Sequence, residues 1–444
     1  MFVYISTVIT VLIAGHTICA YDVLPDPWDT LYVQPEQIHL SLGAVESQMI
    51  VTWTTFDLTA KSTVWYGIQS INMSAHGSAR KFVDGGSEKR QMFIHRVTLT
   101  ALVSGQTYKY HVGSDDGWSP IFTFTALKKG NDWSPRFAIY GDLGNILAAT
   151  LPRLQNEVQQ GLYDAILHVG DIAYDLDLDN ARVGDEFMRQ IEPIAAYIPY
   201  QVCPGNHEQA YNFSNYDNRF SMISSGGHTI NNHFWSTNIG PAHIISISTE
   251  FYYYTKQYGT HQIENQYRWL EQDLIQANKP ENRAQRPWII TIGHRPLYAQ
   301  NHIDNILREG FTFAKDSKPE FGFEELMYKH GVDLSFWAHE HNYERLWPIY
   351  NNKIYNGSVD EPYNNPKAPV HIITGSAGSR ERHTTFIDTP HYSAFQNEEF
   401  GYTRMTIHNA SHIYLEQLSV EREGGQIIDK FYLIKEKHGY DAWF

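Results

Sequence analysis

Side chains able to bind metal ions or transfer protons stand at the ends of five apolar runs in this chain. In order they are Asp142 after FAIYG, Asp171 after ILHVG with Tyr174 three residues later, Asn206 and His207 after QVCPG, His294 after IITIG, and His339 and His341 after LSFWA. Such runs predict buried strands, and an open α/β sheet binds its ligands at the carboxyl ends of its strands. We therefore expect these side chains to converge on one metal site.

The residue types indicate the chemistry of such a site. Carboxylate, imidazole and amide oxygen are good ligands for iron, zinc and manganese. The two oxygens of one aspartate can bridge two ions, and a bridged pair about 3.5–4 Å apart can clamp a phosphoryl group. His339 and His341 share a face if their segment is extended, which lets them address adjacent ions. Glycines before Asp142, Asp171 and Asn206 would let the backbone turn tightly and approach the ions.

Five short blocks contain these residues, in the order G-D-L-G, G-D-I-A-Y, G-N-H-E, G-H-R-P-L-Y and A-H-E-H. This order resembles that of the calcineurin-like metallophosphoesterases, and the tyrosine of the second block marks the purple acid phosphatases among them. The stretch from Trp337 to Pro348, W-A-H-E-H-N-Y-E-R-L-W-P, is similar to the long form found in animals. The resemblance extends over nearly the whole chain after its first segment, because large purple acid phosphatases also carry an N-terminal fibronectin-III-like domain.

The resemblance implies two metal ions that share Asp171. The ligand sets that it implies are Asp142, Tyr174 and His341 for a ferric ion, and Asn206, His294 and His339 for a divalent Fe, Zn or Mn ion. A tyrosine phenolate on Fe(III) gives the family its purple colour. Much of the superfamily has a histidine two residues after the first aspartate. Here Gly144 occupies that position, and the tyrosine is the replacement ligand.

The mechanism implied is direct hydrolysis, in which a metal-bound hydroxide attacks phosphorus without a covalent enzyme intermediate. His207 would bind the phosphate or protonate the leaving alkoxide. Plant relatives have a histidine pair nine and ten residues after the fourth-block histidine. This chain offers only His302 there, which is the second candidate for a catalytic residue. Glu208 and Arg295 neighbour ligands, and they either support them or lie on the surface.

Three functions are compatible with these blocks. We expect a secreted binuclear-metal acid phosphatase that hydrolyses phosphate monoesters. A phosphodiesterase or nucleotide pyrophosphatase on the same scaffold is one alternative, because pocket shape rather than motif separates the two. A non-catalytic secreted binding protein is the other, although every implied ligand position is intact.

The rest of the chain indicates two kinds of structure. Residues 34–127 consist of short alternating runs and turns, typical of a β-sandwich, and Leu102–Tyr108 resembles the tyrosine corner of fibronectin type III domains. After a polar linker, strand-like and helix-like stretches alternate over 136–400, which indicates an α/β domain. The resemblance implies a metallophosphoesterase domain with two packed mixed sheets flanked by helices. Strands over 401–444 are expected to complete it.

Periodicity places helices within the α/β part. Two stretches have apolar residues at helical spacing, and a short helix is expected at Glu324–Tyr328. The apolar positions of the two longer stretches are Leu147, Leu151, Leu154, Val158 and Leu162, and then Ile263, Tyr267, Leu270 and Leu274. Histidines inside apolar strands, His168 and His243, are predicted to be core residues, as is Cys203.

Composition and the first segment bear on partners and location. The chain has 444 residues and a net charge of −15, so nucleic acid and anionic membranes are excluded as main partners, since both need a basic face. A small phosphate ester is the expected partner. Residues 1–20 resemble a secretory signal, which predicts secretion, with a lysosome-like compartment as the alternative, and no membrane attachment after cleavage. Four Asn-x-Ser sequons predict glycosylation at Asn72, Asn212, Asn356 and Asn409.

Overall fold

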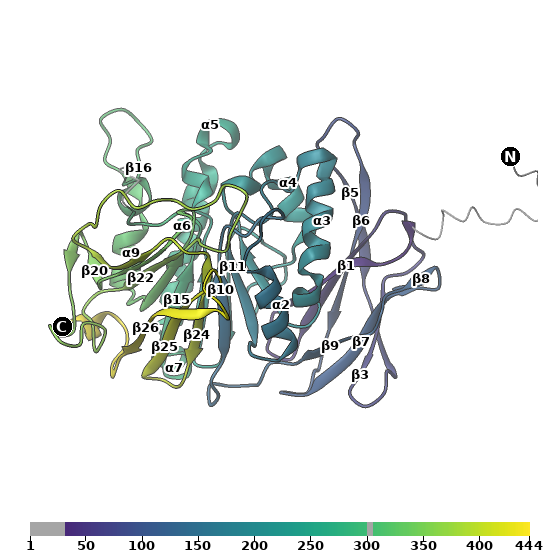
Figure 1. Cartoon of the computed structure of the whole chain (residues 1–444), viewed down its shortest axis with the longest axis horizontal. Coiled ribbons are helices and arrows are strands. Elements are labelled where there is room, and N and C mark those ends of the chain that lie inside the picture. The colour runs from purple at the N-terminus through teal and green to yellow at the C-terminus, as the bar shows by residue number, and fades with distance from the viewer. Residues whose placement is uncertain (1–31, 300–304) are drawn as a thin grey trace, which may run out of the picture.

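The computed structural model describes residues 32–299 and 305–444. Within them the chain forms an all-β N-terminal part and a larger part built of helices and two large sheets (Figure 1). The N-terminal strands, drawn in purple and blue, lie at one end of the molecule, and the last strands, drawn in yellow, lie beside strands from the middle of the chain. The predicted signal segment and His302 fall outside the described residues.

The N-terminal part is a sandwich of two antiparallel sheets that share one core, as predicted. One sheet has the order β1-β2-β6-β5, and in the other β4-β3-β7-β8 is joined by β9 on β7. The strands are β1 (Glu36–Leu42), β2 (Met49–Thr55), β3 (Thr63–Gly67), β4 (Met73–His76), β5 (Ser78–Val83), β6 (Gln91–Leu99), β7 (Thr107–Ser114), β8 (Gly117–Trp118) and β9 (Phe122–Thr125). The tyrosine corner is present, because the Val103 N–H donates to the Tyr108 hydroxyl over 2.9 Å.

The first large sheet combines strands that are far apart in the sequence. Its order is β12-β11-β10-β24-β25-β26, with β10, β11 and β12 parallel and the last three strands antiparallel. The strands are β10 (Arg136–Tyr140), β11 (Ala165–Val169), β12 (Tyr200–Cys203), β24 (Gly401–Ile407), β25 (His412–Ser419) and β26 (Gln426–Ile434). Residues after 400 therefore continue the sheet that begins just after the linker.

The second large sheet has the order β13-β14-β15-β18-β22-β19-β23, in which β14, β15, β18 and β22 are parallel. The strands are β13 (Trp235–Ile239), β14 (Ala242–Ser246), β15 (Trp288–Ile292), β18 (Leu334–Trp337), β19 (Tyr343–Leu346), β22 (Val370–Thr374) and β23 (Ser393–Asn397). Every residue of β11, β14, β15, β18 and β22 is buried, as expected for parallel strands covered on both faces. The prediction of two mixed sheets flanked by helices is confirmed.

Helices and short strands fill the connections. The helices are α2 (Leu151–Gln159), α3 (Leu178–Ala195), α4 (Ala210–Arg219), α5 (Thr255–Tyr258), α6 (His261–Ala277), α7 (Pro280–Gln285), α8 (Ile306–Glu309) and α9 (Phe323–Lys329). The remaining short elements are the 3₁₀ turns η1 (Asn206–Glu208), η2 (Glu250–Tyr252) and η3 (Tyr440–Trp443) and the strands β16 (Gly310–Phe311), β17 (Glu320–Phe321), β20 (Ile349–Tyr350) and β21 (Lys353–Ile354). No helix in the described ranges is long and apolar enough to cross a membrane.

The predicted helices exist, with one difference in extent. Helix α6 contains all four expected apolar positions, and α9 ends before Gly331, whose φ of +62° suits the glycine. Helix α2 begins only at Leu151 and ends before Gly161, so Leu147 and Leu162 lie outside it. A proline in its first turn and a glycine after its end limit the helix more tightly than the apolar spacing does.

Helix α3, which no periodicity predicted, joins the sandwich to the larger part. Figure 1 shows it between the six-stranded sheet and the sandwich strands. Its Glu192 accepts the Ile38 N–H over 2.9 Å. Its buried Asp185 pairs with Arg219 at 2.9 Å and with Arg90 of the sandwich at 2.6 Å. The buried ion pairs fix how the two parts meet, because breaking one would leave an uncompensated buried charge.

Candidate metal centre

The parallel strands bring the predicted ligands to one edge of the two sheets. Five of the predicted ligands follow a buried strand by two or three residues: Asp142 follows β10, Asp171 follows β11, Asn206 follows β12, His294 follows β15, and His339 follows β18. The chain passes so close that a Cβ on Gly205 would lie 2.2 Å from Oδ1 of Asp171. A glycine is therefore required where the third block approaches the aspartate.

Four of the predicted ligands have a left-handed backbone conformation. The φ angles are +58° at Asp142, +48° at Asp171, +53° at Tyr174 and +72° at His339. This conformation is costly for residues with a Cβ, and it persists where the surrounding structure holds it in place, typically at functional sites. The loops after β10, β11 and β18 are thus bent to turn these side chains toward a common point.

The first group of donors consists of Asp142, Tyr174 and His341. The Tyr174 hydroxyl donates to Oδ1 of Asp142 over 2.9 Å and lies 2.8 Å from Nε2 of His341. That same Nε2 is 3.4 Å from the Asp142 carboxylate. Tyr174, which alone would be an ordinary core tyrosine, is fully buried with its hydroxyl between the two other donors.

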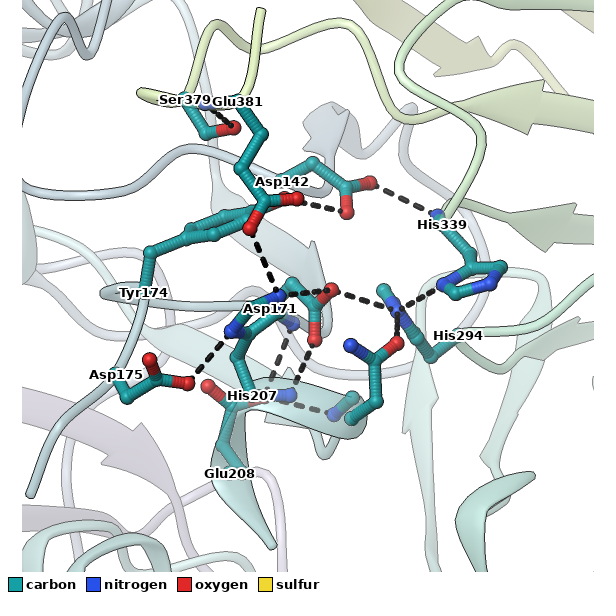
Figure 2. Close-up of polar contacts among 12 residues, drawn as sticks. Asp142, Asp171, Tyr174, Asp175, His207, Glu208, His294, His339, Ser379 and Glu381 are labelled. Atoms are coloured by element: carbon teal, nitrogen blue, oxygen red, sulfur yellow. Dashed lines mark hydrogen bonds and ion pairs between the residues drawn. The ribbon is translucent and has the colours of Figure 1, made fainter. Parts of the chain in front are cut away.

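The second group consists of Asn206, His294 and His339. Nε2 of His294 is 3.2 Å from Oδ1 of Asn206 and 3.2 Å from Nδ1 of His339. It is also 3.1 Å from Oδ2 of Asp171. Ligand atoms of Asp171, His294 and His339 all lie within 4.8 Å of one another, which is compact enough for a single ion. Figure 2 shows Asp171 between Asp142 and Tyr174 on one side and His294 on the other.

Backbone carbonyls orient two of the imidazoles. Nδ1 of His294 is 3.0 Å from the Val169 carbonyl, and Nδ1 of His341 is 2.8 Å from the Arg382 carbonyl. A carbonyl that accepts the N–H of one ring nitrogen fixes the tautomer. The other nitrogen then keeps its lone pair, which faces the site and can bind a metal ion. His339 is held differently, because Arg295 lies 2.9 Å from its Nε2 and Glu250 in turn pairs with Arg295.

Glu208 is a buried residue, not a surface residue, and it binds the backbone of the loops that carry the site. It is 2% exposed, and its carboxylate accepts the N–H groups of Asp171, Ile172 and Gly205 at 2.9, 2.8 and 2.8 Å. Burial, and then the negative charge of Asp171, raises the pKa of Glu208 to about 8. Glu208 therefore joins the loop after β11 to the loop after β12, which together carry the central aspartate and Asn206.

His207 lies at the open side of the site among residues that no motif indicated. Its Nδ1 is 2.6 Å from Asp175, whose other oxygen is 3.3 Å from Arg380. Its Nε2 is 3.5 Å from Glu381 and 3.9 Å from Asp171 (Figure 2). In the sequence, Asp175 was marked only by its place directly after Tyr174. Arg380 and Glu381 lie in the segment after β22, where no motif marked them. His302 is outside the described residues.

Without bound ions, neighbouring carboxylates raise the pKa of three histidines of the site. Burial lowers the pKa of His294, but the negative charge of Asp171 outweighs it and raises that pKa to about 10. Burial also opposes protonation of His207 and His341, yet hydrogen bonds to neighbouring carboxylates raise the pKa of each to about 9. Burial opposes ionisation of Asp171, and His294 nevertheless holds its pKa below the usual range. The carboxylates beside these rings stabilise positive charge, which protons or metal ions can supply.

The donor set fits a pair of transition-metal ions. Imidazole nitrogens with carboxylate, amide and phenol oxygens suit iron, zinc and manganese and exclude a soft, thiolate-binding metal. Burial, and then the charge of Asp142, raises the pKa of Tyr174 well above its usual value, so a highly charged cation is needed to displace its proton. Two donor groups on either side of one aspartate match two ions better than one.

Comparison with known proteins agrees with this site. The N-terminal domain model of purple acid phosphatases matches residues 35–126, and the calcineurin-like phosphoesterase model matches residues 135–343. A third family model, iron/zinc purple acid phosphatase-like protein C, matches residues 368–430. Together these matches extend from the sandwich to the last strand of the six-stranded sheet.

Relatives and solved structures point the same way. "Acid phosphatase type 7" of Danio rerio is 53% identical over 421 residues, which cover 92% of this chain and 93% of the relative. The protein of that name from Homo sapiens is 52% identical over 412 residues, covering 91% and 92%. A purple acid phosphatase from yellow lupin, 22% identical, has the same fold, with a TM-score of 0.72 over 90% of this chain and 74% of its own. The family matches and the animal relatives establish that this chain belongs to the purple acid phosphatases, which are metallophosphoesterase enzymes.

Proposed function

We propose that this enzyme hydrolyses phosphate monoesters at two metal ions that share Asp171. The proposed ligands are Asp142, Tyr174 and His341 for Fe(III), and Asn206, His294 and His339 for a divalent Fe, Zn or Mn ion. The observation that carries the proposal is the convergence of two donor groups on either side of Asp171 (Figure 2). A relative from Arabidopsis thaliana, 27% identical, is named Fe(3+)-Zn(2+) purple acid phosphatase 12, which supports an iron-containing pair.

The bound ions would supply activation of water and neutralisation of phosphoryl charge. The protein supplies the proton and the orientation. His207 is 19% exposed, and its Nδ1 is held by Asp175, so its Nε2 faces the opening of the site. With a pKa raised to about 9 by neighbouring carboxylates against the effect of burial, His207 carries a proton at neutral and acid pH. It would bind the phosphate or protonate the leaving alkoxide; His302 remains the second proposed acid.

We also propose that the protein is secreted and glycosylated. The signal-like segment over residues 1–20 and the four sequons support this route. Asn72, Asn212 and Asn409 are exposed, and Asn356 is half-buried, so the first three are the better acceptors. Mass measurement of the secreted protein before and after deglycosylation tests both parts of the proposal.

A visible spectrum with metal analysis of the purified protein tests the metal centre. We expect a charge-transfer band and about two metal ions per chain, one of them iron. Tyr174→Phe keeps the buried ring but removes the hydroxyl, so it should abolish the band. Tyr200→Phe is the matched control, since Tyr200 is also a buried tyrosine but bonds only to Tyr140 and His168. A band that survives in Tyr174→Phe, or that is lost equally in both variants, would refute the ligand role.

Substrate class needs its own measurement. The phosphodiesterase alternative uses the same ions, so the metal content cannot distinguish the two functions. We expect turnover of phenyl phosphate to exceed that of its bis-ester analogue, diphenyl phosphate, in the same preparation. Preferred hydrolysis of the bis-ester would overturn the monoester proposal and leave the metal centre standing.

A further inference from the structure

The sequon at Asn212 lies at the edge of a cavity of about 460 Å³. The cavity is bordered by the start of α4, by η2 and by the segment that runs from α5 to the first turn of α6. Its size falls in the range of small-molecule pockets, roughly 300–1,000 Å³. The proposed metal ligands are all described in the structure and none of them lines the cavity, so it is separate from the metal centre.

Aromatic rings form much of the cavity wall. They come from three parts of the chain and are Phe213, His233, Phe251, Tyr254 and Tyr258. The ring centroid of Phe213 lies 6.0 Å from that of Tyr258 and 4.9 Å from that of His233. A sugar ring has faces made of C–H groups, and such a face gains dispersion energy against an aromatic ring. The wall therefore suits a sugar.

The carboxylates of the cavity are already paired. Asp217 lies 3.1 Å from His233, and Glu250 lies 3.0 Å from Arg295. Neither lysine nor arginine is among the described residues that line the cavity, so charge favours a neutral ligand there. The remaining polar groups can bond to the hydroxyl and acetamide groups of a neutral sugar, and they belong to Gln257, His261 and Gln262.

Asn212 can deliver such a sugar. It is exposed, and it is itself one of the residues that line the cavity. Its backbone N–H donates to the Tyr258 hydroxyl over 3.3 Å, which places the aromatic wall beside the attachment point. A covalently attached sugar binds as an intramolecular ligand at high effective concentration, so even a weak site is filled.

We propose that the cavity holds the first N-acetylglucosamine of a glycan attached to Asn212. The inference rests on the proposed glycosylation, and it gives one of the four sequons a structural role. Attachment joins Nδ2 of Asn212 to C1 of the sugar, while the amide loses a proton and the diphosphate of a lipid-linked donor leaves.

Two tyrosines of the wall connect the cavity to the segment before α4. The Tyr254 hydroxyl reaches the Asn206 carbonyl at 3.4 Å. The Tyr258 hydroxyl donates to the Gln209 carbonyl over 2.7 Å. A sugar packed on these rings holds them against that segment, so we expect it to raise the melting temperature of the protein.

The test compares melting temperatures of the secreted protein with and without this sugar. Ser214→Ala breaks the sequon, and the hydroxyl that it deletes is buried and has no hydrogen-bond partner in the described residues. We expect the melting temperature to fall by about 2 °C in this variant. Endoglycosidase H leaves one N-acetylglucosamine at each occupied site, so wild type made with high-mannose glycans and then trimmed should melt like untrimmed wild type.

Ser74→Ala is the matched control for the sequon. It removes the sequon of Asn72, which is exposed on β4 outside the cavity, and it should leave the melting temperature unchanged. An equal fall in Ser74→Ala and Ser214→Ala would mean that glycans stabilise the protein without the cavity, and it would overturn the inference. A trimmed wild type that melts like Ser214→Ala would overturn it too, since the first sugar is then not the one that stabilises.

A double-mutant cycle separates the sugar from other effects of the wall. Tyr258→Leu removes one ring, and its cost in melting temperature should be smaller when Ser214→Ala has already removed the sugar. Additive costs contradict contact between ring and sugar. Glycopeptide mass spectrometry reports which sequons are occupied. An unoccupied Asn212 beside other occupied sequons overturns this inference alone, whereas four unoccupied sequons overturn the proposed glycosylation as well.

Discussion

Two buried histidines in different regions of the molecule have pKa values shifted in opposite directions. His95 in the sandwich and His294 at the metal centre are both fully buried. Burial lowers the pKa of His95 to about 4, whereas the pKa of His294 is raised to about 10 because the Asp171 charge outweighs burial. His95 stacks on Trp53 at 4.9 Å and bonds to the neutral hydroxyls of Ser62 and Thr55. The difference lies in the partners and not in the depth of burial.

The partners of a buried histidine indicate whether its role is structural or functional. A histidine with hydroxyl partners is neutral in the folded protein and contributes packing, whereas a histidine beside carboxylates lies in a field that attracts protons or metal ions. Of the two core histidines predicted from the sequence, His168 is of the first kind, whereas His243 pairs with the carboxylate of Asp273 at 2.7 Å. His168 bonds to the Tyr200 hydroxyl at 2.7 Å, and burial lowers its pKa to about 3. A single carboxylate partner therefore does not mark the metal centre, which is distinguished by several imidazoles that converge on one carboxylate, as His294 and His339 do on Asp171.

Removing the central carboxylate should have the largest effect. Asp171→Asn takes away the charge that holds His294 and the proposed bridge between the ions, so we expect activity to fall by more than about a thousandfold, the upper end for loss of one electrostatic stabiliser. Both ions should also bind more weakly, which metal analysis after dialysis measures. Asp273→Asn is the matched control, since Asp273 also pairs with a histidine, His243 at 2.7 Å, outside the site. Near-normal turnover in Asp171→Asn would refute the shared-ligand role.

His95 in the sandwich should affect the stability of the fold and not the activity. Between pH 6.5 and about 4 the unfolded chain binds a proton at His95 that the folded chain does not, so stability from this group is complete above pH 6.5 and is lost as the pH falls toward 4. One such imidazole accounts for about 3 kcal/mol over that window. His95→Gln should reduce the pH dependence of the unfolding free energy by about this amount, measured by denaturant titration. Parallel curves for wild type and variant would contradict the assignment.

The sequence predicted which side chains converge, because they follow buried strands and form short blocks. Asp142 and His294 could be placed at strand ends from the apolar runs alone, and the resemblance to the purple acid phosphatases implied Tyr174 as a ligand. The residues around His207 could not be predicted in this way. Glu381 comes from the segment after β22, more than 170 residues after His207, and only the fold brings the two side chains to 3.5 Å.

The fold was predictable where apolar residues dominate a segment and not where polar residues interrupt it. The sandwich strands form short apolar runs between turns, and the Tyr108 corner follows from a local motif. Helix α3 buries residues at helical spacing from Gly184 to Ala195, but the buried positions include Gly184 and the charged Asp185, and the helix contains Pro193, so it was not predicted. Glu208 was ambiguous because a charged residue beside a ligand gives no sign in the sequence of whether it is buried.

Glu208 provides the smallest and most selective test, because it is a buried carboxyl group that accepts hydrogen bonds from backbone N–H groups and not from a histidine in the described residues. Glu208→Gln keeps the shape but turns an acceptor into a donor that faces one of those N–H groups, so the loops carrying Asp171 and Asn206 should separate slightly. We expect activity or metal affinity to fall roughly 10–100-fold, as for other residues that orient ligands.

The control for this last test is Glu192→Gln, because Glu192 also accepts a backbone N–H, that of Ile38, but at the sandwich contact. It should change the unfolding free energy without changing the metal content. If Glu208→Gln lowers only stability, as Glu192→Gln does, then Glu208 is a packing residue and the ligands are oriented by their own contacts. If Glu208→Gln lowers metal affinity while stability is maintained, Glu208 supports the centre through its hydrogen bonds to backbone N–H groups. Carboxyl groups would then support this site by positioning loops as well as by their charge.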